Sequence, residues 1–185
     1  MYDYIKYWKD RIKNHGSVNS SINATIIDHE NYLLSKYIQK NDLVLDYGIG
    51  EGRLFPFYNK VKPIVFGYDI IDYSEFINKQ REKHNKFEYY NCDVTSTKFS
   101  FDVVIAFSIL THIKPFDLRR IINEIMTMGK IAIISAYNDT ALEINEDTYC
   151  FLHDYEEMFS DYKILETEKI DKIQYWVLKK QSKII

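Results

Sequence analysis

The sequence predicts an α/β fold built on an open, mostly parallel β-sheet, and three observations support this prediction. Apolar segments with strand character alternate with amphipathic segments of helical period along most of the chain. In the stretch 44–53, Val-Leu-Asp-Tyr-Gly-Ile-Gly-Glu-Gly-Arg, a strand breaks into alternating glycines before a helix, as in the nucleotide crevice of such sheets. Near the C-terminus, the β-rich segments 162–168 and 172–178 are separated by so few residues that they predict an antiparallel hairpin.

Length and composition set the broad class. The 185 residues suffice for one domain with a substantial core, so a single domain over 1–185 is expected. A net charge of -3 gives no overall attraction for nucleic acid. The N-terminus does not resemble a secretory signal, and no apolar run approaches the roughly 20 residues of a membrane span. Cys92 and Cys150 are isolated, which favours a reducing, cytoplasmic setting and predicts no metal site.

The elements follow one another in a regular order. The apolar run 101–107 is continuous, which is typical of a strand buried on both faces. Asp154 and Glu157 have the spacing of a capping box and predict the start of the last helix. His29 and His84 lie in stretches that look helical and solvated, so no function is expected of them. We expect helices at 3–14 and 25–39 and from Ser74 and Pro115 onward, and further strands at 43–47, 64–69, 87–90 and 130–136.

The glycine-rich stretch has the form of a nucleotide-binding turn, and two ligand classes compete for it. Gly48, Gly50 and Gly52 can adopt positive φ and let a ligand lie against the backbone. A dinucleotide fingerprint needs a third small residue for close packing, and Arg53 stands there instead. Asp46 places negative charge where a pyrophosphate would need the opposite. The sulfonium and ammonium groups of S-adenosylmethionine would tolerate that charge.

The pattern D-x-G-x-G-x-G resembles motif I of the class I, Rossmann-like methyltransferases that use S-adenosylmethionine. Five β/α units followed by an antiparallel hairpin are also the strand signature of that family, so the resemblance covers nearly the whole chain. It implies a three-layer sandwich around a seven-stranded sheet, mostly parallel with an antiparallel C-terminal hairpin. It further implies that residues 1–40 form a helical cap over the cofactor site.

The resemblance also implies which residues hold the cofactor. Asp69, at the end of the second strand, would accept hydrogen bonds from the ribose hydroxyls, and Asp93 would accept one from the adenine amino group. Structural roles stay open for both, as a helix cap and an Asx-turn. On the first helix, Arg11 could meet the methionine carboxylate, although the aromatic residues Tyr7 and Trp8 beside it could equally be core. The expected cofactor-binding residues are Asp46, Tyr47, Gly48, Gly50, Asp69, Ile70, Asp93, Val94, Phe107, Ser108, Arg11 and Trp8.

The end of the fourth strand is where such folds place the acceptor. The stretch 107–113, Phe-Ser-Ile-Leu-Thr-His-Ile, resembles the strand followed by L-x-H of many small-molecule methyltransferases. It lacks the Asn/Asp-Pro-Pro-Tyr/Phe motif of enzymes that methylate nucleobase amino groups. The chain also has neither a Pro-Cys nucleophile nor the carboxylate set of the catechol type. His112 is the candidate general base, with a packing role left open. The candidate acceptor-binding residues are His15, His112, Tyr137, Tyr149 and His153.

The segment 137–161 is rich in acids and contains neither Lys nor Arg, so it would repel the phosphates of a nucleic acid. We expect it to act as part of a lid over a small neutral or cationic acceptor. The sequence therefore predicts methyl transfer from S-adenosylmethionine to an O or N atom of a small molecule. The open alternatives are an RNA or protein methyltransferase, a non-catalytic S-adenosylmethionine-binding subunit, and a nicotinamide oxidoreductase.

Overall fold

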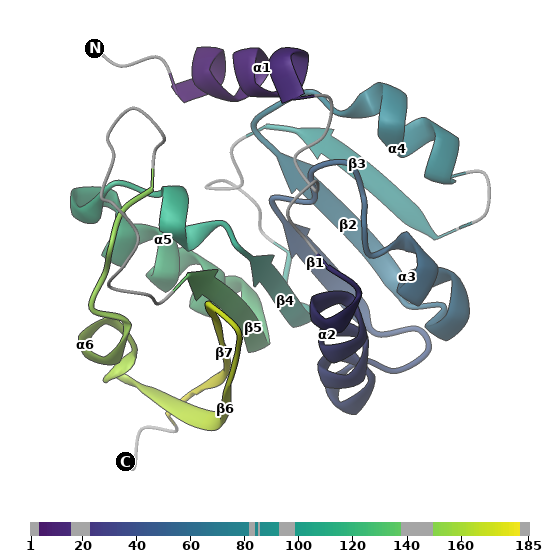
Figure 1. The fold of residues 1–185 in the computed structure, drawn as a ribbon. Helices are drawn as coiled ribbons and strands as arrows, with labels where there is room; N and C mark the ends of the chain where they lie inside the picture. The colour runs from purple at the N-terminus through teal and green to yellow at the C-terminus, as the bar shows by residue number, and fades with distance from the viewer. Residues whose placement is uncertain are drawn as a thin grey trace. The chain divides into compact units, whose positions relative to one another are not determined.

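The chain divides into two compact units, Met1–Ser96 (unit 1) and Thr97–Ile185 (unit 2). Each unit contributes its own strands and its own core (Figure 1). The computed structural model describes residues 4–15, 23–81, 84, 86–92, 99–137 and 150–181.

Unit 1 contains three parallel strands in the order β3-β2-β1. The register pairs Tyr47 of β1 with Tyr68 of β2, and Asp69 of β2 with Asn91 of β3. The carboxyl ends of the three strands therefore lie at one edge, where the loops after β1 and β2 leave the sheet. Its elements are α1 (Tyr4–His15), α2 (Ala24–Tyr37), β1 (Leu43–Tyr47), α3 (Phe55–Val61), β2 (Ile64–Asp69), α4 (Ser74–Arg81) and β3 (Phe87–Asn91).

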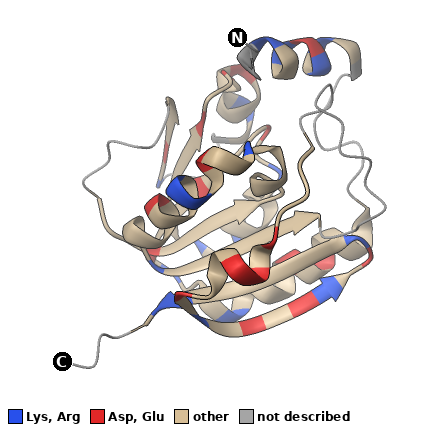
Figure 2. Ribbon diagram, turned by 90° about the vertical axis from the view of Figure 1, so that its left-hand side faces the viewer, with Lys and Arg blue, Asp and Glu red and all other residues tan. Residues whose placement is uncertain are grey.

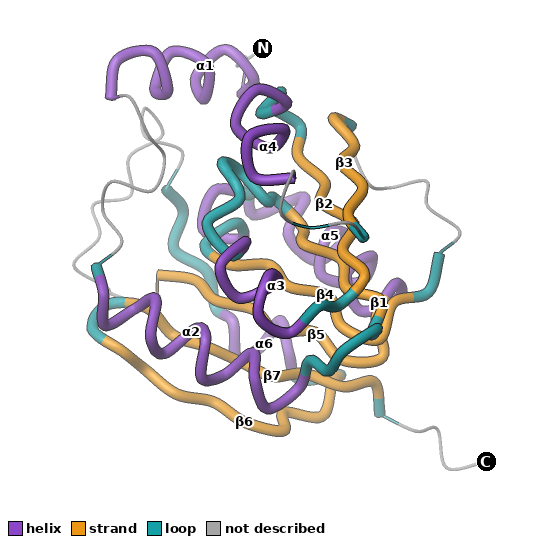
Figure 3. Tube along the Cα trace, turned by 90° about the vertical axis from the view of Figure 1, so that its right-hand side faces the viewer, coloured by secondary structure: helices purple, strands orange, loops and turns teal. Residues whose placement is uncertain are grey.

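Local signals explain where the helices of unit 1 begin. The side chain of Asn23 caps α2 by accepting a hydrogen bond from the Ile26 N–H at 3.0 Å. Pro56 lies in the first turn of α3, where its missing N–H costs no hydrogen bond. Helices α2 and α3 lie side by side in Figure 3. Their inner faces join the strands in a core that includes Leu33, Leu34, Val44, Leu45, Phe55, Tyr58 and Val65.

His84 belongs to this core, so the expectation of a solvated helical histidine is wrong. The residue is 2% exposed and lies beyond the end of α4. Its Nε2 atom is 3.1 Å from the carbonyl oxygen of Pro63, and its ring packs on those of Phe55 and Tyr58. Burial lowers the pKa of His84, which favours a neutral packing residue.

Unit 2 contains four strands in the order β4-β5-β7-β6. β4 and β5 are parallel, whereas β7 is antiparallel to both β5 and β6, which confirms the predicted C-terminal hairpin. Its elements are β4 (Phe101–Phe107), the 3₁₀ helix η2 (Leu110–His112), α5 (Pro115–Met128), β5 (Gly129–Tyr137), α6 (Tyr155–Phe159), β6 (Tyr162–Ile170) and β7 (Ile173–Lys180).

The core of unit 2 lies between α5, α6 and the strands. Tyr155 and Phe159 of α6 pack on Trp176 of β7, with ring centroids 4.9 and 5.2 Å apart. Asp154 caps α6 by accepting a hydrogen bond from the Glu157 N–H, as its spacing in the sequence predicted. Charged residues lie on α6 and along the exposed strand β6, whereas β4 and β5 are mostly uncharged (Figure 2). Among the described residues, no helix has the length and apolar character needed to cross a membrane.

Candidate active site

The turn after β1 requires its glycines. Gly48, Gly50 and Gly52 have φ values of 75°, 54° and 77°, which residues with a Cβ rarely adopt. The N–H groups of Gly48 and Ile49 both donate to the carbonyl oxygen of Tyr68, at 2.8 and 3.1 Å. A Cβ on Gly52 would lie 2.6 Å from the ring of Phe55. The turn is therefore fixed against β2 and exposes bare backbone at the carboxyl edge of the strands.

Asp69 bridges this glycine turn and its own loop. Its Oδ2 accepts a hydrogen bond from the Gly50 N–H, and its Oδ1 accepts one from the Ile71 N–H, both at 2.9 Å. Burial raises the pKa of Asp69 to about 6, against the lowering effect of these N–H donors. Each carboxylate oxygen can accept a further hydrogen bond. Asp72, which accepts from the Ser74 N–H at the start of α4, takes the capping role that was open for Asp69.

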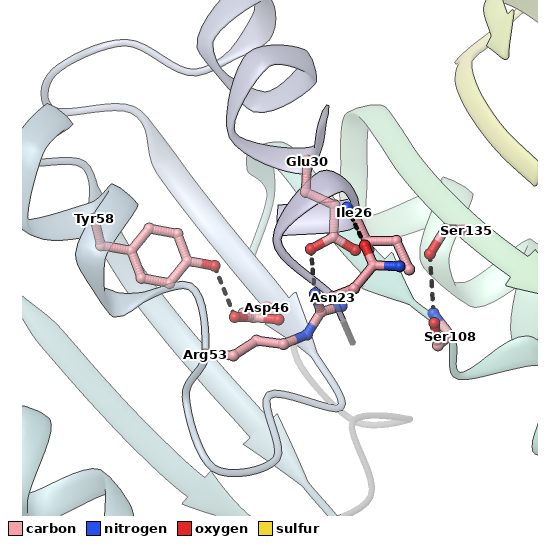
Figure 4. Close-up of polar contacts among 8 residues, drawn as sticks. All are labelled: Asn23, Ile26, Glu30, Asp46, Arg53, Tyr58, Ser108 and Ser135. Atoms are coloured by element: carbon pink, nitrogen blue, oxygen red, sulfur yellow. Dashed lines mark hydrogen bonds and ion pairs between the residues drawn. The ribbon is translucent and has the colours of Figure 1, made fainter. Parts of the chain in front are cut away.

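A second carboxylate, Asp46, precedes the turn in β1 and lies between Tyr58 and Arg53 (Figure 4). Asp46 is 5% exposed, and its Oδ2 accepts a hydrogen bond of 2.7 Å from the Tyr58 hydroxyl. Beside it, the Arg53 guanidinium pairs with the carboxylate of Glu30, which reaches the turn from α2 and is 1% exposed. Arg53 therefore stabilises the packing of α2 on the turn. It occupies the position at which a dinucleotide site has a small residue.

The charges at the turn favour a cationic ligand. The pKa of Asp46 is raised to about 6, chiefly by burial and also by the carboxylates of Asp69 and Glu30, against the lowering effects of the hydrogen bond from Tyr58 and the Arg53 guanidinium. The carboxylates of Asp46, Asp69 and Glu30 thus lie close enough to affect one another, and Arg53 is the guanidinium that opposes them. Such an excess of negative charge disfavours a pyrophosphate and suits a ligand carrying positive charge.

The remaining cofactor candidates lie in different parts of the chain. Tyr47 ends β1 and is half-buried, whereas Ile70 is exposed beside Asp69. On α1, the Arg11 guanidinium lies 5.7 Å from the centroid of the Trp8 ring, so the two side chains contact each other. Asp93 and Val94 lie outside the described residues. Phe107 is buried in unit 2, where its ring packs on that of Tyr175 at 6.0 Å.

In unit 2, the chain turns sharply where β4 ends. Ser108 has a φ of 60°, uncommon for a residue other than glycine. Its N–H donates to the carbonyl oxygen of Ser135 at 2.8 Å and to the Ser135 Oγ at 3.1 Å (Figure 4). These bonds hold the end of β4 to β5 and direct the chain into η2, which carries His112.

Thr111 joins three segments around η2. It is 1% exposed, and its Oγ1 accepts a hydrogen bond of 3.1 Å from the Tyr137 N–H at the end of β5. Its carbonyl oxygen accepts one of 2.8 Å from the Phe151 N–H. His112, next along the chain, has its Nδ1 atom 3.9 Å from the Sγ of Cys150. The structure thereby brings the candidate residues His112 and Tyr137 to one place and adds Cys150, which the sequence did not indicate.

The other acceptor candidates are less accessible or lie outside the described part of the chain. His153 is only 9% exposed, and its ring packs on that of Tyr155 at 5.6 Å. Burial lowers the pKa of His153, so a neutral ring is favoured at neutral pH. His15 is the last residue of α1, but its side chain is outside the described residues, as is the whole of Tyr149.

Comparison with known proteins identifies the family. Residues 22–182 match the family model described as a methyltransferase domain. No curated protein matches the sequence. Among solved structures, the 1,6-didemethyltoxoflavin-N1-methyltransferase of Burkholderia thailandensis, with bound 1,6-didemethyltoxoflavin and S-adenosylhomocysteine, has a TM-score of 0.80 and 15% identity over 96% of this chain and 87% of its own.

Two further structures have the same fold. The magnesium protoporphyrin IX methyltransferase of Synechocystis PCC 6803, with bound S-adenosylmethionine, has a TM-score of 0.75 and 15% identity over 98% of this chain and 99% of its own. An rRNA methylase of Escherichia coli has a TM-score of 0.62 and 15% identity over 85% of this chain and 64% of its own.

The predicted fold, a Rossmann-like seven-stranded sheet that is mostly parallel and ends in an antiparallel hairpin, is thus confirmed. The match to the family model extends over most of the chain. The chain therefore belongs to the methyltransferase domain family, and it is a methyltransferase dependent on S-adenosylmethionine.

Proposed function

We propose that the protein transfers the methyl group of S-adenosylmethionine to an O or N atom of a small molecule. The observation that carries the proposal is the position of Asp69, whose carboxylate accepts hydrogen bonds from both the glycine turn and its own loop. A half-buried carboxylate at the end of β2, beside bare glycine backbone, suits the vicinal hydroxyls of a ribose.

The residues of unit 1 fit this cofactor in charge and in shape. Gly48 and Gly50 provide backbone without side chains, and the excess of carboxylates around Asp46 suits a ligand with a sulfonium and an ammonium group. Arg53 pairs with Glu30 and fills the position that a dinucleotide site leaves open. We further propose that the chain acts as one domain, with residues 1–40 as a cap. The pairing of Glu30 with Arg53, which places α2 against the turn, supports this role for the cap.

When bound, S-adenosylmethionine supplies a methyl group on a sulfonium, which is already a good leaving group. The residues of the chain then need chiefly to align the acceptor and exclude water. A general base is required only if the acceptor must lose a proton, and we assign that role to His112. If the Nδ1–H of His112 is directed at the Cys150 sulfur, Nε2 carries the lone pair that a base needs.

Two observations favour a small acceptor. The methyltransferase with the TM-score of 0.80 was crystallised with a small molecule, 1,6-didemethyltoxoflavin. The described residues after β5, 150–161, include four acids and neither Lys nor Arg, which disfavours a phosphate backbone. The likeness to an rRNA methylase keeps an RNA substrate as the second candidate.

Both cysteines carry thiols rather than a disulfide, which supports a cytoplasmic location.

The test of the proposal is ligand binding by calorimetry with S-adenosylhomocysteine and NAD. We expect S-adenosylhomocysteine to bind and NAD to show no binding. The variant Asp69→Ala lacks the carboxylate that would accept hydrogen bonds from the ribose. It should bind S-adenosylhomocysteine more weakly by about 1.5–3 kcal/mol, roughly 10- to 150-fold, as for hydrogen bonds to a charged group. Asp72→Ala is the matched control, because it removes a neighbouring carboxylate that only caps α4. Binding of NAD, or equal affinity in the Asp69 variant, would refute the proposal.

A further inference from the structure

Two side chains of the strand β3 hold the loop that carries Asp69. The hydroxyl group of Tyr89 donates a hydrogen bond to the carbonyl oxygen of Ile71 and accepts one from the N–H of Tyr73, both at 2.9 Å. The side-chain amide of Asn91 donates to the main-chain carbonyl oxygen of Asp69, also at 2.9 Å. Tyr89 and Asn91 are two residues apart on one strand, so they lie on the same face of it.

These bonds fix the peptide groups on which the Asp69 carboxylate depends. The N–H of Ile71 donates to the Oδ1 of Asp69, while the carbonyl oxygen of the same residue accepts from Tyr89. Ile71 is thus bonded on both sides. Burial raises the pKa of Tyr89 to about 12, so its hydroxyl keeps its proton and remains a donor through the neutral range. The side chains of Tyr89 and Asn91 thus anchor the segment 69–73 to β3 at three of its residues, Asp69, Ile71 and Tyr73.

We propose that Tyr89 and Asn91 are positioning residues that hold the Asp69 carboxylate in the orientation needed to accept hydrogen bonds from the ribose hydroxyls of the cofactor. The inference rests on the proposed function of Asp69. A carboxylate that is already held in place loses less conformational entropy when the ligand binds. Loosening the loop should therefore weaken the contribution of the ribose hydroxyls to binding. Both side chains bond to the main chain of this loop, so we expect them to act through Asp69.

The residue between them provides a matched control. Tyr90 has the same side chain as Tyr89 but lies on the opposite face of β3. Its hydroxyl group bonds to the exposed carboxylate of Glu88, and its ring stacks on that of Tyr68 with centroids 4.9 Å apart. Tyr90→Phe therefore removes a hydroxyl group from the same strand without touching the bonds that anchor the loop.

The experiment uses the full chain and two nucleosides, 5′-methylthioadenosine and its 2′,3′-dideoxy analogue. Calorimetry gives the ratio of their affinities, which reports only on the ribose hydroxyls. We expect the wild type and Tyr90→Phe to show the same preference for the hydroxylated ligand. Tyr89→Phe and Asn91→Ala should each reduce that preference about fivefold, which corresponds to losing the contribution of about one hydrogen bond from the ribose hydroxyls. Asp69→Ala should abolish it.

The outcomes separate this inference from the proposed function. If Asp69→Ala abolishes the preference but Tyr89→Phe and Asn91→Ala keep it, positioning by β3 is refuted and the ribose role of Asp69 stands. If Tyr89→Phe weakens both ligands equally, its role is structural only, and positioning is again refuted. If the wild type shows no preference, the ribose role itself fails. Asn91 is exposed, so Asn91→Ala keeps the inference testable even where Tyr89→Phe fails to fold.

Discussion

Asp46 is a buried carboxylate whose protonation links the stability of the protein to pH. Its pKa is raised by burial from 3.8 to about 6, because the charged form loses its hydration. A raised pKa means that the stabilising contribution is present below pH 3.8 and is lost as the pH rises through about 6. A shift of about two units corresponds to roughly 3 kcal/mol between these limits.

Asp46→Asn should therefore gain stability relative to the wild type as the pH rises. We expect the free energy of unfolding of the variant, minus that of the wild type, to become more favourable by about 2–3 kcal/mol between pH 4 and pH 7. An asparagine oxygen can still accept from Tyr58, so that bond contributes little to the pH dependence. Urea unfolding at both pH values measures this difference, and a difference independent of pH would contradict the prediction.

Asp72→Asn is the control with the opposite sign. The pKa of Asp72 is lowered by its hydrogen bonds from Ser74, so its stabilising contribution is present above the ordinary pKa of 3.8 and is lost as the pH falls. The asparagine variant at this exposed site should thus lose stability relative to the wild type as the pH rises.

The second prediction at the scale of single residues concerns His112. If His112 is the general base, His112→Ala should lower turnover by roughly 10²- to 10⁴-fold and leave the affinity for S-adenosylhomocysteine unchanged. Turnover is measured as formation of S-adenosylhomocysteine with an acceptor found by screening small O and N nucleophiles. Cys150→Ser, which changes only the sulfur near Nδ1, should retain most of the activity. An unaltered rate in His112→Ala would assign the residue to packing around η2.

At the scale of elements, the sequence predicted what local signals determine. The start of α3 is specified by the strand β1, the glycines that follow it and Pro56. The start of α6 is specified by the spacing of Asp154 and Glu157. Contacts between residues far apart in the sequence carry no such signal. The sequence therefore did not reveal the partners of Glu30 and His112, which lie 23 and 38 residues away.

The pairing of Glu30 with Arg53 leads to a prediction about helix α2. The side chains are 1% and 16% exposed, so removing either one takes away the ion-pair partner of a charge held in the interior. Glu30→Ala and Arg53→Ala should each destabilise the protein by about 3–5 kcal/mol, and the double variant by clearly less than their sum. Denaturant unfolding of all four proteins gives the coupling energy. Additive effects would show that the pair does not fasten α2 to the glycine turn.

At the scale of the whole molecule, charge bears on the class of acceptor. The chain carries a net charge of -3. Part of the acidic stretch after β5 is compensated, because the Arg119 guanidinium lies 3.4 Å from Glu157 and 3.8 Å from Asp161. Tyr155 is 2% exposed and belongs to the core, so it offers no surface to an acceptor. Of the segment 137–161 expected to form part of a lid, Tyr137 and Phe151 are therefore the described aromatic residues that could face an acceptor, and residues 138–149 lie outside the described residues.

A protein that acts on a small molecule should bind RNA weakly at physiological salt. Binders of nucleic acid release counterions from the phosphates, so their affinity falls steeply between 50 and 200 mM salt, by roughly 10³- to 10⁵-fold for six to ten phosphate contacts. We expect fluorescence anisotropy with labelled tRNA and single-stranded RNA to show no binding below micromolar concentrations at 150 mM salt. The affinity for RNA should change little when the salt concentration is lowered, because the acids of residues 150–161 repel phosphates. Tight binding with a steep salt dependence would instead favour the RNA methyltransferase, the second candidate function.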